Sequence, residues 1–102
     1  MKLDFTGYNG EQYNEPFVPE HTREALQRYV EHGNYPGGFL MAVLTNDLFG
    51  AVGRADSTNI KYIKDICMFV YNRMPSNSWG NEDKVHKFVE EYFYERLDKQ
   101  AS

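Results

Sequence analysis

Arg54 is the side chain in this sequence best suited to holding a ligand, because polar residues stand on both sides of it. Asn46 and Asp47 precede it, and Asp56 follows. A guanidinium group grips phosphate through two parallel hydrogen bonds, while amide and carboxylate groups bind sugar hydroxyls or base edges. The same side chains also suit an internal ion pair between Arg54 and either aspartate, with Asp56 capping the next helix. The two interpretations are compatible if a ligand shares the arginine.

A glycine turn at Pro36, Gly37 and Gly38 leads into the apolar run that precedes these polar residues. Backbone N–H groups at a helix start, with no side chains over them, favour an anion such as phosphate. The turn lacks the lysine and the spacing of a P-loop, so it is also typical of a chain that simply enters a helix. Phe39, directly after the turn, suits stacking on a ring or packing in the core.

Trp79 lies in a polar connection between two apolar segments, next to Gly80 and shortly after Tyr71 and Asn72. A tryptophan in such a loop can form a stacking wall for a ligand, an anchor in an interface or a lid over the core. The sequence leaves all three alternatives open. The candidate ligand-binding residues are therefore Pro36, Gly37, Gly38, Phe39, Asn46, Asp47, Arg54, Asp56 and Trp79.

Metal and catalytic chemistry find little support in the remaining residues. His21, His32 and His86 lie on separate segments without the paired spacing of a zinc helix, and a single cysteine cannot complete a cysteine-rich site. Cys67 lies within an apolar helical pattern, which predicts a buried and inert thiol rather than a nucleophile. No GxSxG motif occurs. We therefore expect a non-catalytic binding protein that needs no metal and no other cofactor.

The elements that position these residues are predicted from apolar periodicity and helix caps. A first helix over 20–32 stops at Gly33, which supplies a left-handed end. A second helix follows the glycine turn and breaks within 46–53, where two glycines weaken it. Its apolar stripe is expected at Leu40, Val43, Leu44, Asp47 and Leu48, which places Asp47 on the stripe.

Two further helices complete the expected fold. The third begins at Asp56 and ends before Pro75, with its stripe at Ile60, Ile63, Cys67, Val70 and Met74. The fourth is capped by Asn81 or a neighbour, and its apolar face consists of Val85, Phe88, Val89, Tyr92, Phe93 and Leu97. The sequence thus predicts an all-α domain over 19–102, a compact bundle of about four helices.

Residues 1–18 show no sustained period and are interrupted by glycine and proline, which predicts an irregular arm. The arm carries Phe5, Tyr8, Tyr13 and Phe17, too many aromatic rings for a free tail. We expect it to pack on the helical body or on a second subunit. The excess of aromatic residues in the arm and in the last predicted helix favours a homo-oligomer, because obligate interfaces are rich in such side chains.

Composition excludes some classes of protein. The 102 residues make one domain, and a net charge of −4 argues against a general nucleic-acid binder. The sequence has no run of eighteen apolar residues, so no membrane span is expected. The N-terminus lacks the apolar stretch of a signal peptide, which favours the cytoplasm.

The segments HTREALQRYVEHG, PGGFLMAVLTNDLFGAVGRAD and YNRMPSNSWG resemble a group of small, largely uncharacterised proteins of bacteriophages and prophages. The resemblance covers about residues 19–85 and implies a protein made in the cytoplasm of an infected host. Small phage proteins without catalytic signatures often act by binding. The leading hypothesis is a counter-defence sponge that sequesters a nucleotide-like, phosphate-containing signal. The alternatives are an inhibitor that binds a host enzyme or defence protein, and an accessory or structural phage protein.

These hypotheses differ in what they require of the fold. A sponge needs the glycine turn and Arg54 to converge on one pocket, within one chain or across a subunit boundary. A protein-binding inhibitor needs an exposed aromatic or acidic patch remote from those residues.

Overall fold

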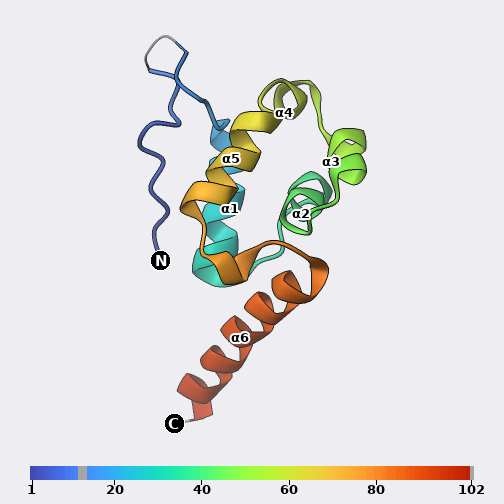
Figure 1. The fold of residues 1–102 in the computed structure, drawn as a ribbon. Coiled ribbons are helices and arrows are strands. Elements are labelled where there is room, and N and C mark those ends of the chain that lie inside the picture. The colour runs from blue at the N-terminus through green and yellow to red at the C-terminus, as the bar shows by residue number, and fades with distance from the viewer. Residues whose placement is uncertain (12–13, 102) are drawn as a thin grey trace.

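The computed structural model describes residues 1–11 and 14–101, with side chains described as far as Phe93. This part of the chain contains six α-helices and one 3₁₀ turn, preceded by the irregular N-terminal arm (Figure 1). They are α1 (Glu20–His32), α2 (Gly38–Leu44), α3 (Leu48–Arg54), α4 (Ser57–Lys61), α5 (Ile63–Arg73), η1 (Ser76–Ser78) and α6 (Glu82–Ala101). The all-α class is confirmed. The expected count of about four helices was too low, because two of the predicted helices are each split in two.

Helix α1 forms as its sequence predicts. It begins after Pro19 and ends at Gly33, which has a positive φ of 67° and donates its N–H to the carbonyl of Tyr29 at 3.0 Å. Glycine reaches this left-handed conformation without the steric cost that a Cβ would bring. The buried face of α1 supplies Leu26, Tyr29 and Val30 to the core.

The predicted second helix breaks after Leu44 and yields α2 and α3. Asn46 adopts a positive φ of 65° in the connection, so the expected break is confirmed. The expectation that Asp47 lies on the apolar stripe was wrong. Its side chain is exposed and accepts a hydrogen bond from the N–H of Gly50 at 2.9 Å, capping α3. An ionised carboxylate keeps its hydration there, which a position on the buried stripe would remove.

The predicted third helix is divided at Tyr62 into α4 and α5. Asp56 caps α4 by accepting from the N–H of Asn59 at 2.7 Å, as expected. Val70 and Met74 of the expected stripe are buried and Ile63 packs against the core, which confirms that part of it. Ile60 and Cys67 are exposed, so their place on the stripe and the expected buried thiol were wrong. The chain leaves helical geometry at Tyr62, and residues on either side of that point no longer share one face.

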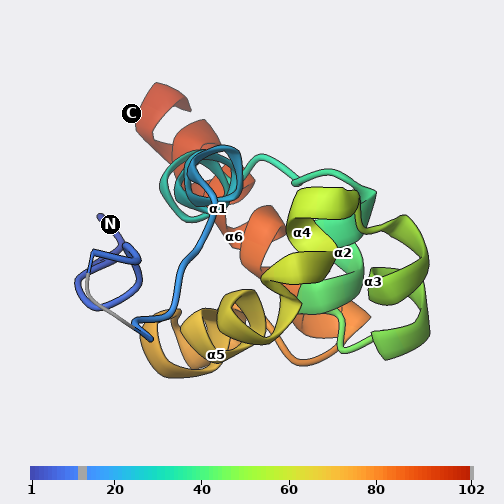
Figure 2. The ribbon, with the colours of Figure 1, turned by 90° about the horizontal axis from the view of Figure 1, so that it is seen from above.

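The N-terminal arm decides which face of α5 is buried. Phe5 stacks on Phe69 with ring centroids 4.3 Å apart, and Tyr8 meets the same ring edge-on at 5.2 Å. Arg73, near the end of α5, donates to the carbonyl of Asp4 at 2.9 Å. Figures 1 and 2 show the arm along α1 and α5, with α2 and α3 on the opposite side of the body. The arm therefore packs on the helical body of its own chain. Tyr13 lies outside the described residues.

Helix α6 packs on the body at its N-terminal end and projects from it at its C-terminal end. Asn81 caps it by accepting from the N–H of Lys84 at 2.9 Å, and Val85 and Phe88 are buried, with Phe88 beside Tyr29. Val89 and Tyr92 also pack against the core, Tyr92 beside Gly33, and the end of α6 extends beyond the body (Figure 1). The radius of gyration is accordingly 14.2 Å, against about 13 Å for a compact domain of this length. The side chain of Leu97, expected on the apolar face, lies outside those described. Among the described residues, no helix is long and apolar enough to span a membrane.

Candidate functional site

Two hollows, both open to solvent, flank Arg54. The first has a volume of about 310 Å³ and is lined by Gly38, Thr45, Asp47, Arg54 and Glu82 among others. The second has a volume of about 270 Å³, and its lining includes His21, Gly37, Gly38, Phe39, Arg54 and Asp56. Arg54 and Gly38 belong to both. The glycine turn and the arginine therefore converge within one chain, as the sponge hypothesis requires.

Helix α3 sets the position of the arginine. Asp47 caps its first turn and Arg54 ends its last, so the two lie seven residues apart on one side of the helix. The distance from Arg54 Nη1 to Asp47 Oδ2 is 4.0 Å. Gly50 lies between them, and a Cβ at that position would clash with the Asp47 carboxylate and come within 2.6 Å of Arg54 Nη1. The absence of a side chain at Gly50 is what permits this arrangement.

The guanidinium of Arg54 keeps its donors available. Its side chain is 58% exposed, and within the described residues the pair with Asp47 is its one ionic contact and it donates no hydrogen bond. The expected internal ion pair thus occurs with Asp47, at a distance that leaves it weak. Asp56 pairs instead with His21, whose Nε2 lies 3.9 Å from Oδ2.

The glycine turn contributes space more than charge. A Cβ at Gly38 would lie 3.1 Å from Arg54 Cδ, whereas one at Gly37 would have no neighbour within 4 Å. Helix α2 has only seven residues, so its dipole adds little and the attraction for an anion has to come from Arg54. Pro36 lines neither hollow. Phe39 is 8% exposed and belongs to the core, with only an edge at the second hollow.

Trp79 and Asn46 line a different hollow, away from Arg54. This hollow has a volume of about 330 Å³, and Val43, Cys67 and Tyr71 also line it. The predicted site residues therefore fall into two groups. The structure gives no support to Trp79 as a stacking wall for a ligand held by Arg54.

Carboxylates dominate the charge around Arg54. Asp47 and Glu82 share the first hollow with it, and Asp56 shares the second. The sequence analysis did not include Glu82 or His21 in the site. Glu82 opens α6 and His21 lies in the first turn of α1, so both reach Arg54 through tertiary packing that no local pattern reveals.

The described residues contain no cluster of three or more histidine, cysteine, aspartate or glutamate side chains placed to hold a metal ion. Comparison of the chain with protein-family models, curated proteins and solved structures gives no match. The geometry around Arg54 is therefore the basis for the functional argument.

Proposed function

We propose that this protein binds a nucleotide-like ligand at Arg54 and sequesters it without chemical change. The observation that carries the proposal is an exposed guanidinium, with its donors unused, between two hollows of about 310 and 270 Å³. A phosphodiester has the matching shape, because its one phosphate carries a substituent on each side. The phosphate would accept hydrogen bonds from Arg54, and the two substituents would occupy the two hollows.

The surrounding carboxylates favour a phosphodiester over a polyphosphate. Asp47, Asp56 and Glu82 outnumber the single guanidinium, so a ligand with several negative charges close together would be repelled. A phosphodiester carries one charge for each phosphate. The carboxylates can in turn accept hydrogen bonds from sugar hydroxyls or from amino groups of a base. Linked dinucleotides meet these conditions and also carry a separate substituent for each hollow. A 3′,5′-cyclic mononucleotide meets the charge condition, but one ribose carries both of its ester oxygens.

The biological role follows from combining this site with the resemblance to phage proteins. A phage protein that sequesters a phosphodiester in the host cytoplasm would remove a signal used in host defence. No covalent step is needed, because removal of the free ligand by binding is sufficient. The alternative, an accessory or structural role in the phage, would be disfavoured if the Arg54 site binds nucleotides.

An exposed apolar face of α3 suits an interface with a second copy of the chain. On α3, the helix that carries Arg54, Leu48 is 67%, Phe49 89% and Val52 47% exposed. We call these three residues the α3 face. A homo-oligomer that buries the α3 face would cover an apolar surface that water disfavours, on the side of α3 opposite Arg54.

A protein-binding function, such as inhibition of a host enzyme or defence protein, is the second candidate. It requires an exposed apolar surface outside the Arg54 site. The hollow beside Trp79 supports it, because Met68 and Tyr71 at its edge are 42% and 66% exposed.

The direct test is thermal melting against a panel of ligands. The panel contains 3′,5′-cyclic mononucleotides, phosphodiester-linked dinucleotides and nucleoside triphosphates. A ligand present at a hundred times its Kd stabilises the folded state by about 2.7 kcal/mol, which corresponds to a rise in Tm of several degrees. We expect such a rise with phosphodiesters and a smaller one with triphosphates. A panel without any shift would refute the proposal.

Variants at three positions tie the shift to the site. Arg54→Ala should weaken phosphodiester binding by about ten- to a hundredfold, the range for losing a charged hydrogen-bond donor. Gly38→Ala should also weaken binding, because its Cβ displaces the Arg54 side chain, whereas Gly37→Ala adds the same methyl group to open space. Circular dichroism checks that all three variants keep their helicity. Equal binding by Gly38→Ala and Gly37→Ala would place the ligand elsewhere.

A further inference from the structure

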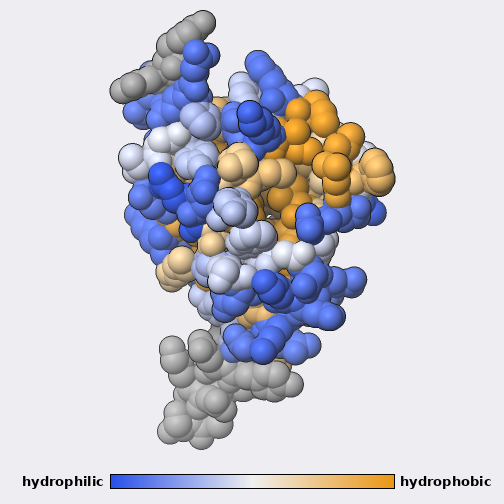
Figure 3. Space-filling model, in the orientation of Figure 1, coloured by the Kyte–Doolittle hydropathy of each residue, from blue (hydrophilic) through white to orange (hydrophobic). Residues whose placement is uncertain are grey.

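An apolar groove runs between α5 and the α2–α3 pair, outside the Arg54 site. Its larger section, about 330 Å³, is lined by Val43, Cys67, Met68, Tyr71 and Trp79, together with Asn46 and Val70. A smaller section of about 80 Å³ shares Val43, Asn46 and Cys67 and extends toward Ala51 and Ile63. Its lining also includes Asp47, which the first Arg54 hollow shares, and Leu48 of the α3 face. We call the two sections together the Trp79 groove. Figure 3 shows hydrophobic side chains gathered on the face seen there, toward α3 and α4.

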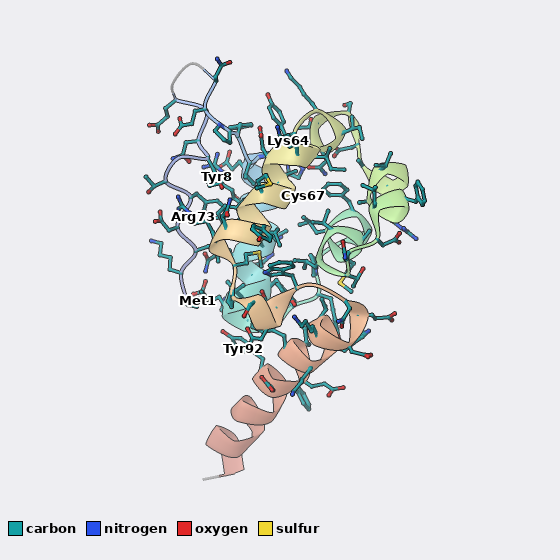
Figure 4. All side chains as sticks on the ribbon, viewed as in Figure 1. Met1, Tyr8, Lys64, Cys67, Arg73 and Tyr92 are labelled. Carbon is teal, nitrogen blue, oxygen red and sulfur yellow. The ribbon has the colours of Figure 1, made fainter. Side chains whose placement is uncertain are left out.

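The α5 wall of the groove presents a regular set of exposed side chains. Lys64, Cys67, Met68 and Tyr71 follow one another at intervals of three, one and three residues, so they lie on one face of the helix. Figure 4 labels Lys64 and Cys67 on successive turns of α5. From Lys64 to Tyr71 the face spans about 10 Å along the axis, or two helical turns. A bound helix with apolar anchors spaced one turn apart over two turns would match this length.

The charges beside the groove specify the partner further. Lys64 is exposed and has no ion pair within the described part of the chain. The carboxylate of Asp47, which lines the smaller section, already caps α3 and lies 4.0 Å from Arg54. The charge left for a partner is therefore positive, although the chain as a whole carries −4. A partner with a carboxylate at the Lys64 end of the groove would complement it.

Trp79 adds a requirement for a hydrogen-bond acceptor. Its indole Nε1 is buried and has no hydrogen-bond partner within the described residues. A buried N–H without an acceptor costs about 1–3 kcal/mol, so a small movement of the ring that reached an acceptor would be favourable. A bound peptide offers carbonyl and side-chain oxygens at its edge. The open shape of the groove suits a peptide better than a small apolar molecule, which would stay half exposed.

We propose that the Trp79 groove binds a short amphipathic helix of another protein, with apolar anchors one turn apart and an acidic residue facing Lys64. The anchors would bury Met68, Tyr71 and the exposed edge of Cys67. This proposal does not rest on the Arg54 site, and Arg54→Ala should leave helix binding unchanged.

Selection from a displayed library of sixteen-residue amphipathic peptides, with the full-length protein as bait, tests the proposal. Cys67 and Trp79 are the only cysteine and tryptophan in the chain and both line the groove, so they report its occupancy without labels. Enriched peptides are synthesised and added to the protein at saturation. We expect Cys67 alkylation to slow by about tenfold or more, as its exposed edge is covered, and Trp79 emission to shift.

Matched variants define the location and the charge preference. Met68→Glu should abolish binding of the enriched peptides, while Ile60→Glu, at a side chain equally exposed (43% against 42%), should retain it. Lys64→Glu should lower the affinity for acidic peptides by about three- to tenfold, the effect of a charge at the rim of an interface. The same selection against Lys64→Glu should then enrich basic peptides.

Four outcomes would overturn the proposal. They are failure to enrich any amphipathic peptide, binding that leaves Cys67 alkylation unchanged, equal binding to Met68→Glu, and peptides enriched by the wild-type protein that show no preference for acidic residues. Two observations would reassign the groove. If protection of Cys67 from alkylation rose with protein concentration alone, the groove would be assigned to contact with a second copy of the chain. If a short fatty acid protected Cys67 from alkylation as strongly as a peptide does, the groove would be assigned to a small apolar ligand.

Discussion

Arg54 makes an ion pair that is too long and too exposed to contribute much stability. At 4.0 Å, with side chains 58% and 53% exposed, the pair with Asp47 falls in the class of surface salt bridges that contribute about 0–1 kcal/mol. Replacing Arg54 should therefore change ligand binding far more than folding. This separation makes the Arg54→Ala experiment informative, because a loss of binding would not reflect a loss of structure.

Tyr29 makes stability depend on pH in the alkaline range. It is fully buried, and its hydroxyl donates to the carbonyl of Ser78 at 2.7 Å. Burial, with a smaller effect from Tyr35, raises the pKa of Tyr29 well above its ordinary value. The unfolded chain would lose this proton from about pH 10, while the folded chain keeps it. The contribution of Tyr29 to stability is thus complete below pH 10 and is lost as the pH rises above it.

Urea denaturation between pH 8 and pH 11 measures this dependence. We expect the free energy of unfolding to fall above pH 10 with a slope that approaches about 1.4 kcal/mol for each pH unit. Tyr29→Phe should flatten the curve in that window. At pH 7 the variant should be less stable by about 1–3 kcal/mol, because the Ser78 carbonyl loses its buried donor. Equal slopes for the two proteins would show that Tyr29 does not control the alkaline transition.

Local sequence signals predicted most of the helix ends, though not the division at Tyr62, and long-range packing decided which faces the helices bury. The left-handed stop at Gly33, the caps at Asp56 and Asn81 and the break after Leu44 are each set by one to four neighbouring residues. The buried face of α5 is set by Phe5, which stacks on Phe69 from far away in the sequence. Periodicity alone could not anticipate that contact, and this is why Cys67 was wrongly expected in the core.

Helix α3 offers a test of how its cap is built. Glycine within a helix is less favourable than alanine by about 1 kcal/mol, and Gly53 has open space around it, so Gly53→Ala should raise the free energy of unfolding. Gly50→Ala should have the opposite effect, because the new Cβ clashes with the Asp47 carboxylate and removes the cap, a loss of about 1 kcal/mol or more.

Urea denaturation of the two variants measures both changes on one helix. The informative result is the difference in sign between two identical substitutions three residues apart. If Gly50→Ala were as stable as Gly53→Ala, the Asp47 side chain could turn away without cost. The position of Arg54 would then not depend on the absence of a side chain at Gly50.

At the scale of the whole molecule, the candidate site residues separate because the connection after α5 folds onto another part of the body. Of the residues that line the Arg54 hollows, Gly37, Gly38, Phe39, Asp47 and Asp56 lie within 36–56, so the sequence could indicate them together. Trp79 lies more than twenty residues later and meets Asn46 in a separate hollow. The contributions of His21 and Glu82 to the Arg54 hollows likewise depend on how α1 and α6 pack. Local patterns could therefore indicate the part of the site near Arg54 in the sequence, and they could not indicate His21 and Glu82, which tertiary packing brings there.

The exposed α3 face bears on the assembly of the whole molecule. Phe49 is 89% exposed and makes almost no contribution to the core of its own chain, so Phe49→Asp should fold normally. If the α3 face joins two copies, the wild-type protein will show concentration-dependent sedimentation and the variant will sediment as a monomer. Because the α3 face lies on the side of α3 opposite Arg54, phosphodiester binding should be the same in the variant. Ile60→Asp, on α4, is the matched control.

Analytical ultracentrifugation and thermal melting distinguish two outcomes that would otherwise look alike. A monomeric wild-type protein at about 100 µM, well above the Kd of a stable obligate interface, would rule out self-association through the α3 face. Binding by Phe49→Asp that equals wild type, in a variant that is monomeric, would show that one chain holds the ligand alone. Loss of both association and binding, with Ile60→Asp unaffected, would mean that Arg54 acts at a subunit boundary. In that case the two open hollows are halves of a site that only a second copy closes, and sequestration becomes a property of the assembly.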